Sequence, residues 1–438
     1  MGERRWIAEQ LSAIETRDKT LLVSAAAGSG KTATLTERII RQLTDDDPIS
    51  VDSLLVVTFT NAAAAELRAK ISKALSLAVA NDPENKRLEH QLYMLPSAKI
   101  RTIDSFCNDI LKNNSDRVGV PSNYRIADSA ECELLAISII EGLIEAVYNG
   151  LLPEIASPED FERLADCLTD SKRTEELAEV FGVIHLKCES AEEGIDLLAR
   201  LTDNYLASDV PVEKNLYGGF LMTRYRELID HYLSAYSRYM RVFSSGGASE
   251  QKYLAALTSD RDVLTSLREA EDYESARARI AEFSLCRLAS VKASDKTADM
   301  EGFATLRKMM KADILKIQKL FVYTTEMWQS LFKTLYRLLS VLYRFEKKFD
   351  EIFAAEKLRL GAFSYADIER YTYKCLINNG ELTDIAVNVS AQFDAIYIDE
   401  YQDVNSLQNR IFEAISKPNN RFMVGDIKQS IYGFRSAC

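Results

Sequence analysis

The sequence predicts an α/β protein whose parallel sheet is interrupted by a large, all-helical insertion. Three observations lead to this fold class. Short apolar runs alternate with helical patterns in residues 1–119, long amphipathic patterns with few strand signals fill residues 120–384, and strand signals return in residues 385–438. The simplest topology is one α/β domain, formed by the two ends of the sequence, with a helical domain inserted between them.

Three short apolar runs predict the strands of the first part. They are Thr20–Ser24, Leu54–Thr58 and the weaker Ala98–Thr102. Each run is followed by a helix-like stretch, and the stretch at 62–80 is rich in Ala, Leu, Lys and Glu. Strands that alternate with helices in this way are typical of a parallel sheet covered by helices.

Helical periodicity dominates the insertion. Its longest amphipathic stretches are 130–148, 223–243 and 312–357. The Ser- and Gly-rich residues 244–249 predict a break between helices. The insertion is therefore expected to be a helical domain of its own.

The last part of the sequence returns to strand signals. Residues 393–398 and 421–424 are strand-like, and a helical pattern over 406–415 separates them. A single sheet that draws strands from both ends of the sequence explains this return.

The composition is that of a soluble globular protein and permits a nucleic-acid partner. Hydrophobic residues make up 47% and charged residues 27% of the 438 residues, which excludes a wholly disordered chain or a collagen. The net charge is −12, but 18 acidic and 5 basic residues fall between 128 and 200, so the remainder is nearly neutral. Between 301 and 359 the net charge is +5, which fits a phosphate-binding face or, more commonly, a solvated helix face.

Cysteines, histidines and apolar runs bear on where the protein acts. The seven cysteines are scattered, without a Cys-x-x-Cys pair, and predict reduced thiols in a cytoplasmic protein. The three histidines are too far apart in sequence to suggest a metal site. No apolar run reaches the ~18 residues of a membrane helix, and none follows the N-terminus as in a secretory signal, so we expect no membrane association.

A glycine-bearing loop after the first expected strand predicts a phosphate site. The loop fits the pattern G-x-x-x-x-G-K-[ST], with Ala in place of the first Gly, over residues Ala25, Ala26, Ala27, Gly28, Ser29, Gly30, Lys31 and Thr32. In such a loop, backbone N–H groups converge on phosphate oxygens and the next helix N-terminus adds positive potential. Lys31 is expected to bind the β- and γ-phosphates of ATP, and Thr32 to offer a hydroxyl to Mg²⁺. A loop that binds nothing is the alternative.

Acidic residues follow the expected strand at 393–398. Ligands of open parallel sheets bind beyond the carboxyl ends of the strands, so Asp399 is expected to hold Mg²⁺. Glu400 is then the group expected to polarise an attacking water. A surface acidic turn is the alternative, and the presence of the phosphate loop favours the catalytic interpretation.

These two motifs and their neighbours resemble the superfamily 1 DNA helicases of the UvrD/Rep/RecB type. The matching stretches are 6–10, 23–35, 57–67, 101–107, 363–368, 399–403 and 424–435. The resemblance implies a RecA-like P-loop NTPase fold with ATP and Mg²⁺ as cofactors. It also implies a DNA helicase that moves along single-stranded DNA with 3′-to-5′ polarity, in double-strand-break repair and recombination.

The resemblance also implies partners. Within this type, the sequence is most similar to the N-terminal part of the helicase subunits of bacterial helicase–nuclease complexes. Single-stranded and double-stranded DNA are therefore expected partners, together with a second helicase–nuclease subunit.

The resemblance assigns roles to further residues. Gln10 is the expected adenine-reading amide, and Gln402 of the acidic box joins the nucleotide-binding set. Gln429 is expected to connect the γ-phosphate with DNA, and Arg435 to act as an arginine finger or, alternatively, to pair with a surface acid. The residues expected to bind single-stranded DNA are Phe59, Thr60, Asn61, Thr102, Ser105, Phe106, Tyr432 and Phe434. For Tyr432 and Phe434, a place in the core is the alternative.

Two features depart from the family pattern. Asp104 stands where related helicases often carry His, and a carboxylate there would repel a phosphate, so we assign it no phosphate contact. The sequence also stops at Cys438, before the motifs of a second RecA-like domain and of a nuclease. We therefore expect a truncated helicase that is a weak ATPase by itself. A non-catalytic module that binds DNA or a partner subunit is the alternative.

Overall fold

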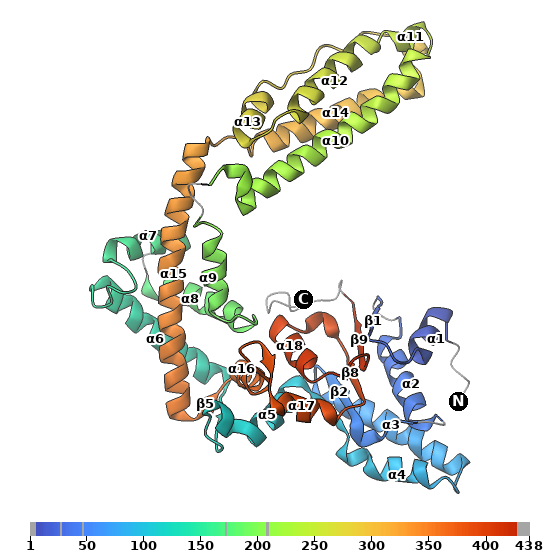
Figure 1. Cartoon of the computed structure of the whole chain (residues 1–438), viewed down its shortest axis with the longest axis vertical. Helices are drawn as coiled ribbons and strands as arrows, with labels where there is room; N and C mark the ends of the chain where they lie inside the picture. The colour runs from blue at the N-terminus through green and yellow to red at the C-terminus, as the bar shows by residue number, and fades with distance from the viewer. Residues whose placement is uncertain (1–5, 27–28, 46–47, 171–172, 207–209, 427–438) are drawn as a thin grey trace. The chain divides into compact units, whose positions relative to one another are not determined.

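The computed structural model describes residues 6–26, 29–45, 48–170, 173–206 and 210–426. The chain forms two compact units, shown with their helices and strands in Figure 1. Unit 1 consists of residues 1–197 and 342–438, and unit 2 of residues 198–341. Among the described residues, no helix combines the length and the apolar character needed to cross a lipid bilayer.

Unit 1 is built on a parallel sheet of five strands. Their order across the sheet is β1 (Leu21–Ser24), β9 (Arg421–Gly425), β8 (Ala395–Ile398), β2 (Leu54–Thr58) and β3 (Lys99–Thr102). All neighbouring pairs are parallel, and Val57 lies opposite both Ile398 and Arg101. The predicted α/β class with a parallel sheet drawn from both ends of the sequence is thereby confirmed.

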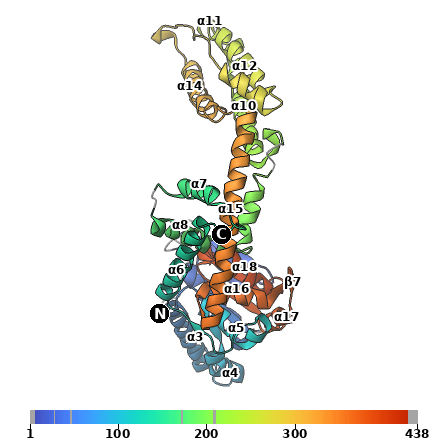
Figure 2. The ribbon, with the colours of Figure 1, turned by 90° about the vertical axis from the view of Figure 1, so that its left-hand side faces the viewer.

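Helices cover both faces of this sheet because β2 is buried on both sides. The backbone alternation of a strand sends Leu54 and Val56 to one face and Leu55 and Val57 to the other. The first face packs against α2 (Lys31–Thr44) and α3 (Asn61–Asn81). The second face packs against α5 (Ile103–Asn114), α16 (Tyr365–Leu376), α17 (Asp384–Ala391) and α18 (Ser406–Ala414), and Figure 2 shows unit 1 from a second side.

Further helices and short strands complete unit 1. Its N-terminal helix is α1 (Ala8–Glu15), and α4 (Lys86–Met94) follows α3. The other helices are α6 (Ser129–Tyr148), α7 (Pro158–Leu168), α8 (Thr174–Glu189) and the last part of α15 (Thr325–Leu360), while α9 (Asp196–Asp203) begins at the border. Two strand pairs of two residues each are β4 (Arg125–Ile126) with β5 (Ala362–Phe363), and β6 (Ile377–Asn378) with β7 (Glu381–Leu382).

Unit 2 is a bundle of helices around an aromatic core. Its helices are α10 (Leu216–Ser244), α11 (Ala248–Gln251), α12 (Leu254–Arg268), α13 (Tyr273–Ala281), α14 (Ala298–Gln318) and the first part of α15. Fully buried rings in this core include Tyr225, Tyr236 and Phe303. The predicted break at 244–249 is confirmed, because α10 ends at Ser244.

The single helical stretch expected over 312–357 is wrong, since α14 ends at Gln318 and α15 begins at Thr325. The connecting residues Phe321-Val322-Tyr323-Thr324 are aromatic or β-branched, and such side chains lose rotamer freedom in a helix. The ring of Phe321 is buried, and the carbonyl of Tyr323 accepts a hydrogen bond from Tyr273 Oη at 2.8 Å. Tertiary contacts therefore hold the chain out of the helix here.

The sheet's core also contains residues from within the predicted insertion. Ile368 and Cys375 of α16 are buried in the same cluster as Leu55 and Ile398. The expected domain boundaries, 1–119, 120–384 and 385–438, differ from this packing-based division and stay a prediction about domains.

Candidate nucleotide-binding site

The carboxyl ends of three neighbouring strands bring the two predicted motifs together. The phosphate loop follows β1, the acidic box follows β8, and β9 lies between these strands. Ala25 N donates a hydrogen bond to Gly425 O at 3.1 Å, so the loop leaves the sheet against the end of β9. Residues that are distant in sequence thus meet at one edge of the sheet.

The described part of the phosphate loop has the backbone of a tight turn into a helix. Ser29 N donates to Ala26 O at 3.2 Å. Gly30 has a φ of +84°, a left-handed conformation that glycine adopts without steric cost, and it directly precedes α2. Lys31 and Thr32 therefore occupy the first turn of α2, where backbone N–H groups lack helical partners. The predicted residues Ala27 and Gly28 lie outside the described residues.

Thr32 and Asp399 face one another across this edge. Thr32 Oγ1 donates to Asp399 Oδ2 at 3.4 Å, and Asp399 N donates to Val57 O at 3.0 Å. Only 8% of Asp399 is exposed. Burial, and next the charge of Glu400, raise the pKa of Asp399, whereas the Glu400 N–H, Thr32 and Lys31 act to lower it. A cation beside Asp399 would relieve this cost, and the hydroxyl and carboxylate oxygens are the hard donors that Mg²⁺ prefers.

Glu400 adopts a strained backbone conformation at the start of the acidic box. Its φ is +52°, which is uncommon for a residue with a side chain and tends to occur at functional sites. Its N–H donates to Asp399 Oδ1 at 3.0 Å, and its Oε2 accepts from Gln402 Nε2 at 2.9 Å. The side chain is therefore held beside Asp399 in a defined orientation.

Gln402 connects the acidic box to the end of β9, a role that the sequence did not reveal. Its Oε1 accepts from Asp426 N at 2.8 Å. A Cβ on Gly425 would lie 2.9 Å from the same oxygen, so the close approach of the two segments requires glycine there. The predicted contact of Gln402 with nucleotide remains a prediction.

Gln10, the expected adenine-reading residue, contacts the phosphate loop. Its Nε2 donates to Ser29 O at 2.8 Å, and its Oε1 accepts from Ile7 N at 3.2 Å. The structure thus places Gln10 of α1 at the predicted nucleotide site, and its contact with adenine stays a prediction.

The residues after β2 lie at the same edge of the sheet. Thr60 Oγ1 accepts from Ala63 N at 3.1 Å and thereby caps α3, while Thr60 and Asn61 are exposed and Phe59 is half-buried. Their predicted contacts with single-stranded DNA stay a prediction.

The residues after β3 need one correction. Thr102 Oγ1 caps α5 by accepting from Ser105 N at 3.3 Å. Phe106, predicted to stack on DNA bases, is only 4% exposed and packs against Phe393, with 6.0 Å between ring centroids. Its ring belongs to the core beneath the sheet and presents no face to a base, so the prediction for Phe106 is wrong. Helix α5 turns this residue inward, whereas Ser105 is half-buried.

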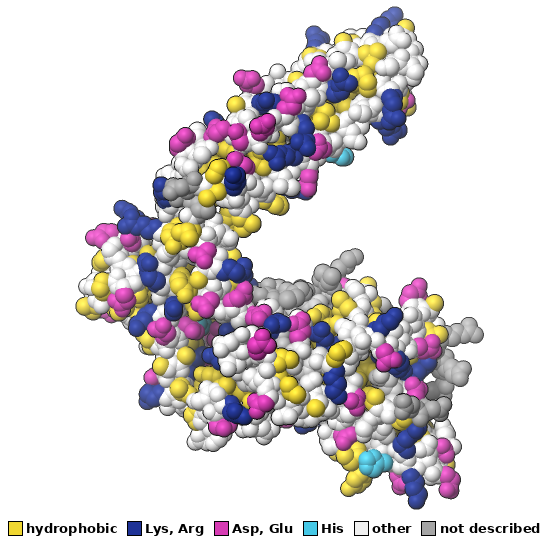
Figure 3. All heavy atoms as spheres, viewed as in Figure 1, with side chains coloured by type: hydrophobic (Ala, Val, Ile, Leu, Met, Phe, Trp, Pro, Cys, Tyr) yellow, Lys and Arg dark blue, Asp and Glu magenta, His cyan; other side chains and the backbone are white. Residues whose placement is uncertain are grey.

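Four predicted residues, Gln429, Tyr432, Phe434 and Arg435, lie outside the described residues, and their roles stay predictions. The basic stretch 301–359 is described, and several of its cations pair within the chain. Arg307 pairs with Asp260, and Lys316 with Asp313. Basic and acidic side chains are also mixed over the visible face (Figure 3).

Comparison with known proteins decides the family. Residues 6–438 match the UvrD/REP helicase N-terminal domain. The chain belongs to this family. It is 33% identical to AddA, a subunit of the ATP-dependent helicase/nuclease, of Desulforamulus reducens, over 100% of this chain and 36% of that protein. The corresponding protein of Clostridium beijerinckii is 34% identical over 100% of this chain and 36% of its own length.

A third relative, the corresponding ATP-dependent helicase/nuclease protein of Geobacillus kaustophilus, is 32% identical over 99% of this chain and 36% of its own length. The UvrD/REP family member described here thus spans about a third of the length of these curated relatives. The similarity confirms the predicted resemblance to UvrD-type helicases and, within them, to the N-terminal part of AddA.

Proposed function

We propose that the carboxyl edge of the unit 1 sheet binds ATP with Mg²⁺, and that ATP hydrolysis there drives movement along single-stranded DNA. The observation that carries the proposal is the 3.4 Å contact between Thr32 Oγ1 and Asp399 Oδ2. It joins a residue of the phosphate loop to a buried carboxylate at the end of another strand. This is the arrangement that a P-loop nucleotide site needs.

The phosphate loop binds the triphosphate in this proposal. Backbone N–H groups of residues 25–32 and the N-terminus of α2 face the phosphate oxygens. Lys31 contributes a positive charge at the β- and γ-phosphates. Thr32 and Asp399 would hold Mg²⁺, which when bound neutralises charge that develops on the phosphates.

Glu400 is the proposed base for the attacking water. It follows Asp399 directly, and Gln402 holds its carboxylate through the 2.9 Å hydrogen bond. A positioned base beside the phosphate loop can accept a proton from water as the γ-phosphoryl group leaves. Gln429 and Arg435 are proposed to assist at the γ-phosphate.

DNA and partner roles complete the proposal. Phe59, Thr60, Asn61, Thr102 and Ser105 are proposed to contact single-stranded DNA without reading its sequence. Tyr432 and Phe434 are proposed to stack on bases. We further propose 3′-to-5′ polarity, a role in the repair of double-strand breaks in the cytoplasm, and a second helicase–nuclease subunit of the AddB type as partner, as the relatives' name suggests.

Steady-state ATP turnover by the 438-residue chain, measured with and without single-stranded DNA, tests this proposal. We expect slow turnover that rises when DNA is added, because the phosphate loop and the proposed DNA residues lie at one edge of the same sheet. A folded chain that binds DNA but shows neither ATP binding nor turnover would contradict the proposal. It would instead support a non-catalytic binding module.

A further inference from the structure

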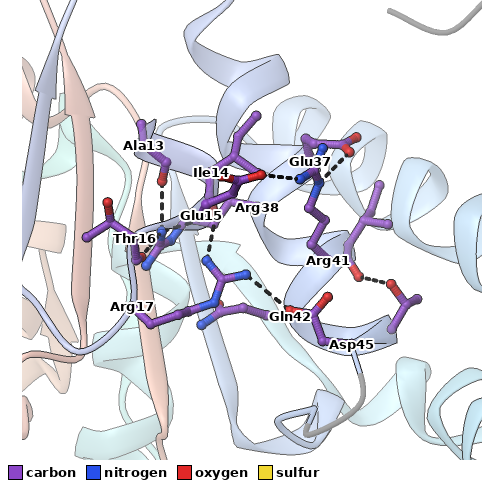
Figure 4. A network of polar contacts seen from close by, with 12 residues as sticks. Ala13, Ile14, Glu15, Thr16, Arg17, Glu37, Arg38, Arg41, Gln42 and Asp45 are labelled. Carbon is purple, nitrogen blue, oxygen red and sulfur yellow. Dashed lines mark hydrogen bonds and ion pairs between the residues drawn. The ribbon is translucent and has the colours of Figure 1, made fainter. Parts of the chain in front are cut away.

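Arg38 is a buried cation that the proposed nucleotide chemistry leaves without a role. It lies on α2, and only 5% of the residue is exposed. Its Nη1 donates to Ala13 O at 2.7 Å, to Ile14 O at 3.4 Å and to Thr16 O (Figure 4). These carbonyls end α1, where a helix has no backbone donors of its own to satisfy them.

The other surroundings of Arg38 also favour a planar cation. Its guanidinium carbon lies 4.7 Å from the centre of the Phe422 ring on β9. Burial lowers the pKa of Arg38, although a guanidinium keeps its proton in proteins. Carbonyls at a helix C-terminus and an aromatic face both attract a cation. Arg38 therefore joins α1, α2 and the sheet in one contact.

Helix α1 connects Arg38 to the phosphate loop. Gln10 lies on the same helix and donates to Ser29 O at 2.8 Å. Arg38 thus fixes the C-terminal end of α1, while Gln10 contacts the loop from the N-terminal half. A shift of the end held by Arg38 would move Gln10 relative to Ser29.

We propose that Arg38 is a positioning residue for base recognition: it holds α1 so that Gln10 can read the nucleotide base beside the phosphate loop. This inference rests on the proposed ATP site and goes beyond it, because Arg38 itself touches neither phosphate nor metal. Arg38 accordingly controls the preference for adenine over other bases, and leaves binding of the triphosphate moiety to the loop.

Two neighbouring arginines provide a comparison within the same network. Arg41 pairs with Glu37 at 3.0 Å and with Glu15 at 3.1 Å, and Arg17 pairs with Asp45 at 3.3 Å (Figure 4). Both arginine side chains are about one-third exposed, at 32% and 30%. Exposed ion pairs contribute little. Arg41→Gln is therefore a matched control on the same helix.

The test compares the affinities of Mg·ATP, Mg·GTP and Mg·tripolyphosphate for the 438-residue chain by equilibrium titration. Arg38→Met is expected to reduce the preference for ATP over GTP by about tenfold, the effect of a lost hydrogen bond to the base, with tripolyphosphate affinity nearly unchanged. Arg38→Lys keeps the charge but not the planar fork, and should restore part of the preference. Arg41→Gln should behave as the unaltered chain.

A second experiment keeps the inference falsifiable if Arg38→Met does not fold, as judged by circular dichroism. Gln10→Ala should also lose the preference, and adding Arg38→Lys to it should cause no further loss, because both act through one contact. The inference is overturned if folded Arg38 variants keep the preference or weaken all three ligands equally. If the unaltered chain binds none of them, the proposed ATP site fails instead.

Discussion

The edge of the unit 1 sheet and the interior of unit 2 both gather charged groups, but they hold them differently. In unit 2, Asp260 is fully buried, and Arg307 contacts both of its oxygens, at 2.5 and 3.0 Å. Tyr236 Oη donates to the same carboxylate at 3.2 Å. This cluster joins α10, α12 and α14, and its hydrogen bonds come from the protein itself.

The edge of the sheet shows the opposite arrangement. Asp399 accepts a long hydrogen bond from Thr32, at 3.4 Å, and Glu400 has a strained backbone. The pKa of Asp399 is raised by burial and by Glu400, so its charged form is disfavoured where it stands. The comparison teaches that a carboxylate satisfied by the chain stabilises the fold, whereas one held at a cost is available to a ligand.

The largest expected effect belongs to Glu400→Gln. Glutamine keeps the shape but cannot accept a proton from water, so ATP turnover in the intact enzyme should fall by about 10²–10⁴-fold while ATP still binds. Asp394→Asn is the matched control, since Asp394 lies just before β8, at its opposite end, and pairs with Lys417 at 3.0 Å. Near-normal turnover after Glu400→Gln would mean that another residue is the base.

Asp260→Ala should destabilise unit 2 by about 3–5 kcal/mol, because it leaves Arg307 buried without its carboxylate. Trp328 donates to Tyr273 Oη at 2.9 Å and reports on unit 2 by its fluorescence during denaturation. ATP affinity should be retained by the folded variant. Asp230→Ala, which removes an exposed pair with Arg268, should change stability by less than about 1 kcal/mol. Equal effects of the two variants would contradict the comparison.

A buried histidine makes the stability of unit 1 depend on pH. Burial opposes the charge of His185, but Glu189 and Glu346 outweigh it and raise its pKa to about 9. Because this pKa exceeds the ordinary value of about 6.5, the stabilisation is complete below pH 6.5 and is lost as the pH rises through 9. The free energy of unfolding should fall by roughly 2–3 kcal/mol from pH 6.5 to pH 10. An unchanged pH dependence in His185→Gln would assign the effect to another group.

The sequence predicted the polar edge of the sheet better than the rest of the molecule, and the reason is physical. Apolar runs that end in polar residues, such as those before Thr58 and Asp399, mark both a strand and the place where a ligand binds. The turn between α14 and α15 escaped prediction because amphipathic periodicity continues across it. The break depends instead on the contact between Tyr273 and Tyr323, which are 50 residues apart.

Phe106 and Arg38 show two further limits. An aromatic residue after a strand looks the same in sequence whether its ring faces solvent or the core, and only the packing against Phe393 decides. Arg38 lies among charged residues of an amphipathic helix, and no pattern in the sequence indicated that its partners would be three carbonyls of α1. Both outcomes depend on tertiary contacts between distant segments.

The central claim is that the carboxyl edge of the sheet binds ATP, and Lys31 tests it most directly. Calorimetric titration of Mg·ATP should show that Lys31→Ala weakens binding by about 1–3 kcal/mol, because one charge at the phosphates is lost. Lys417→Ala, at the opposite end of β8, should bind ATP as tightly as the unaltered chain. Equal affinities of Lys31→Ala and the unaltered chain would contradict the claim.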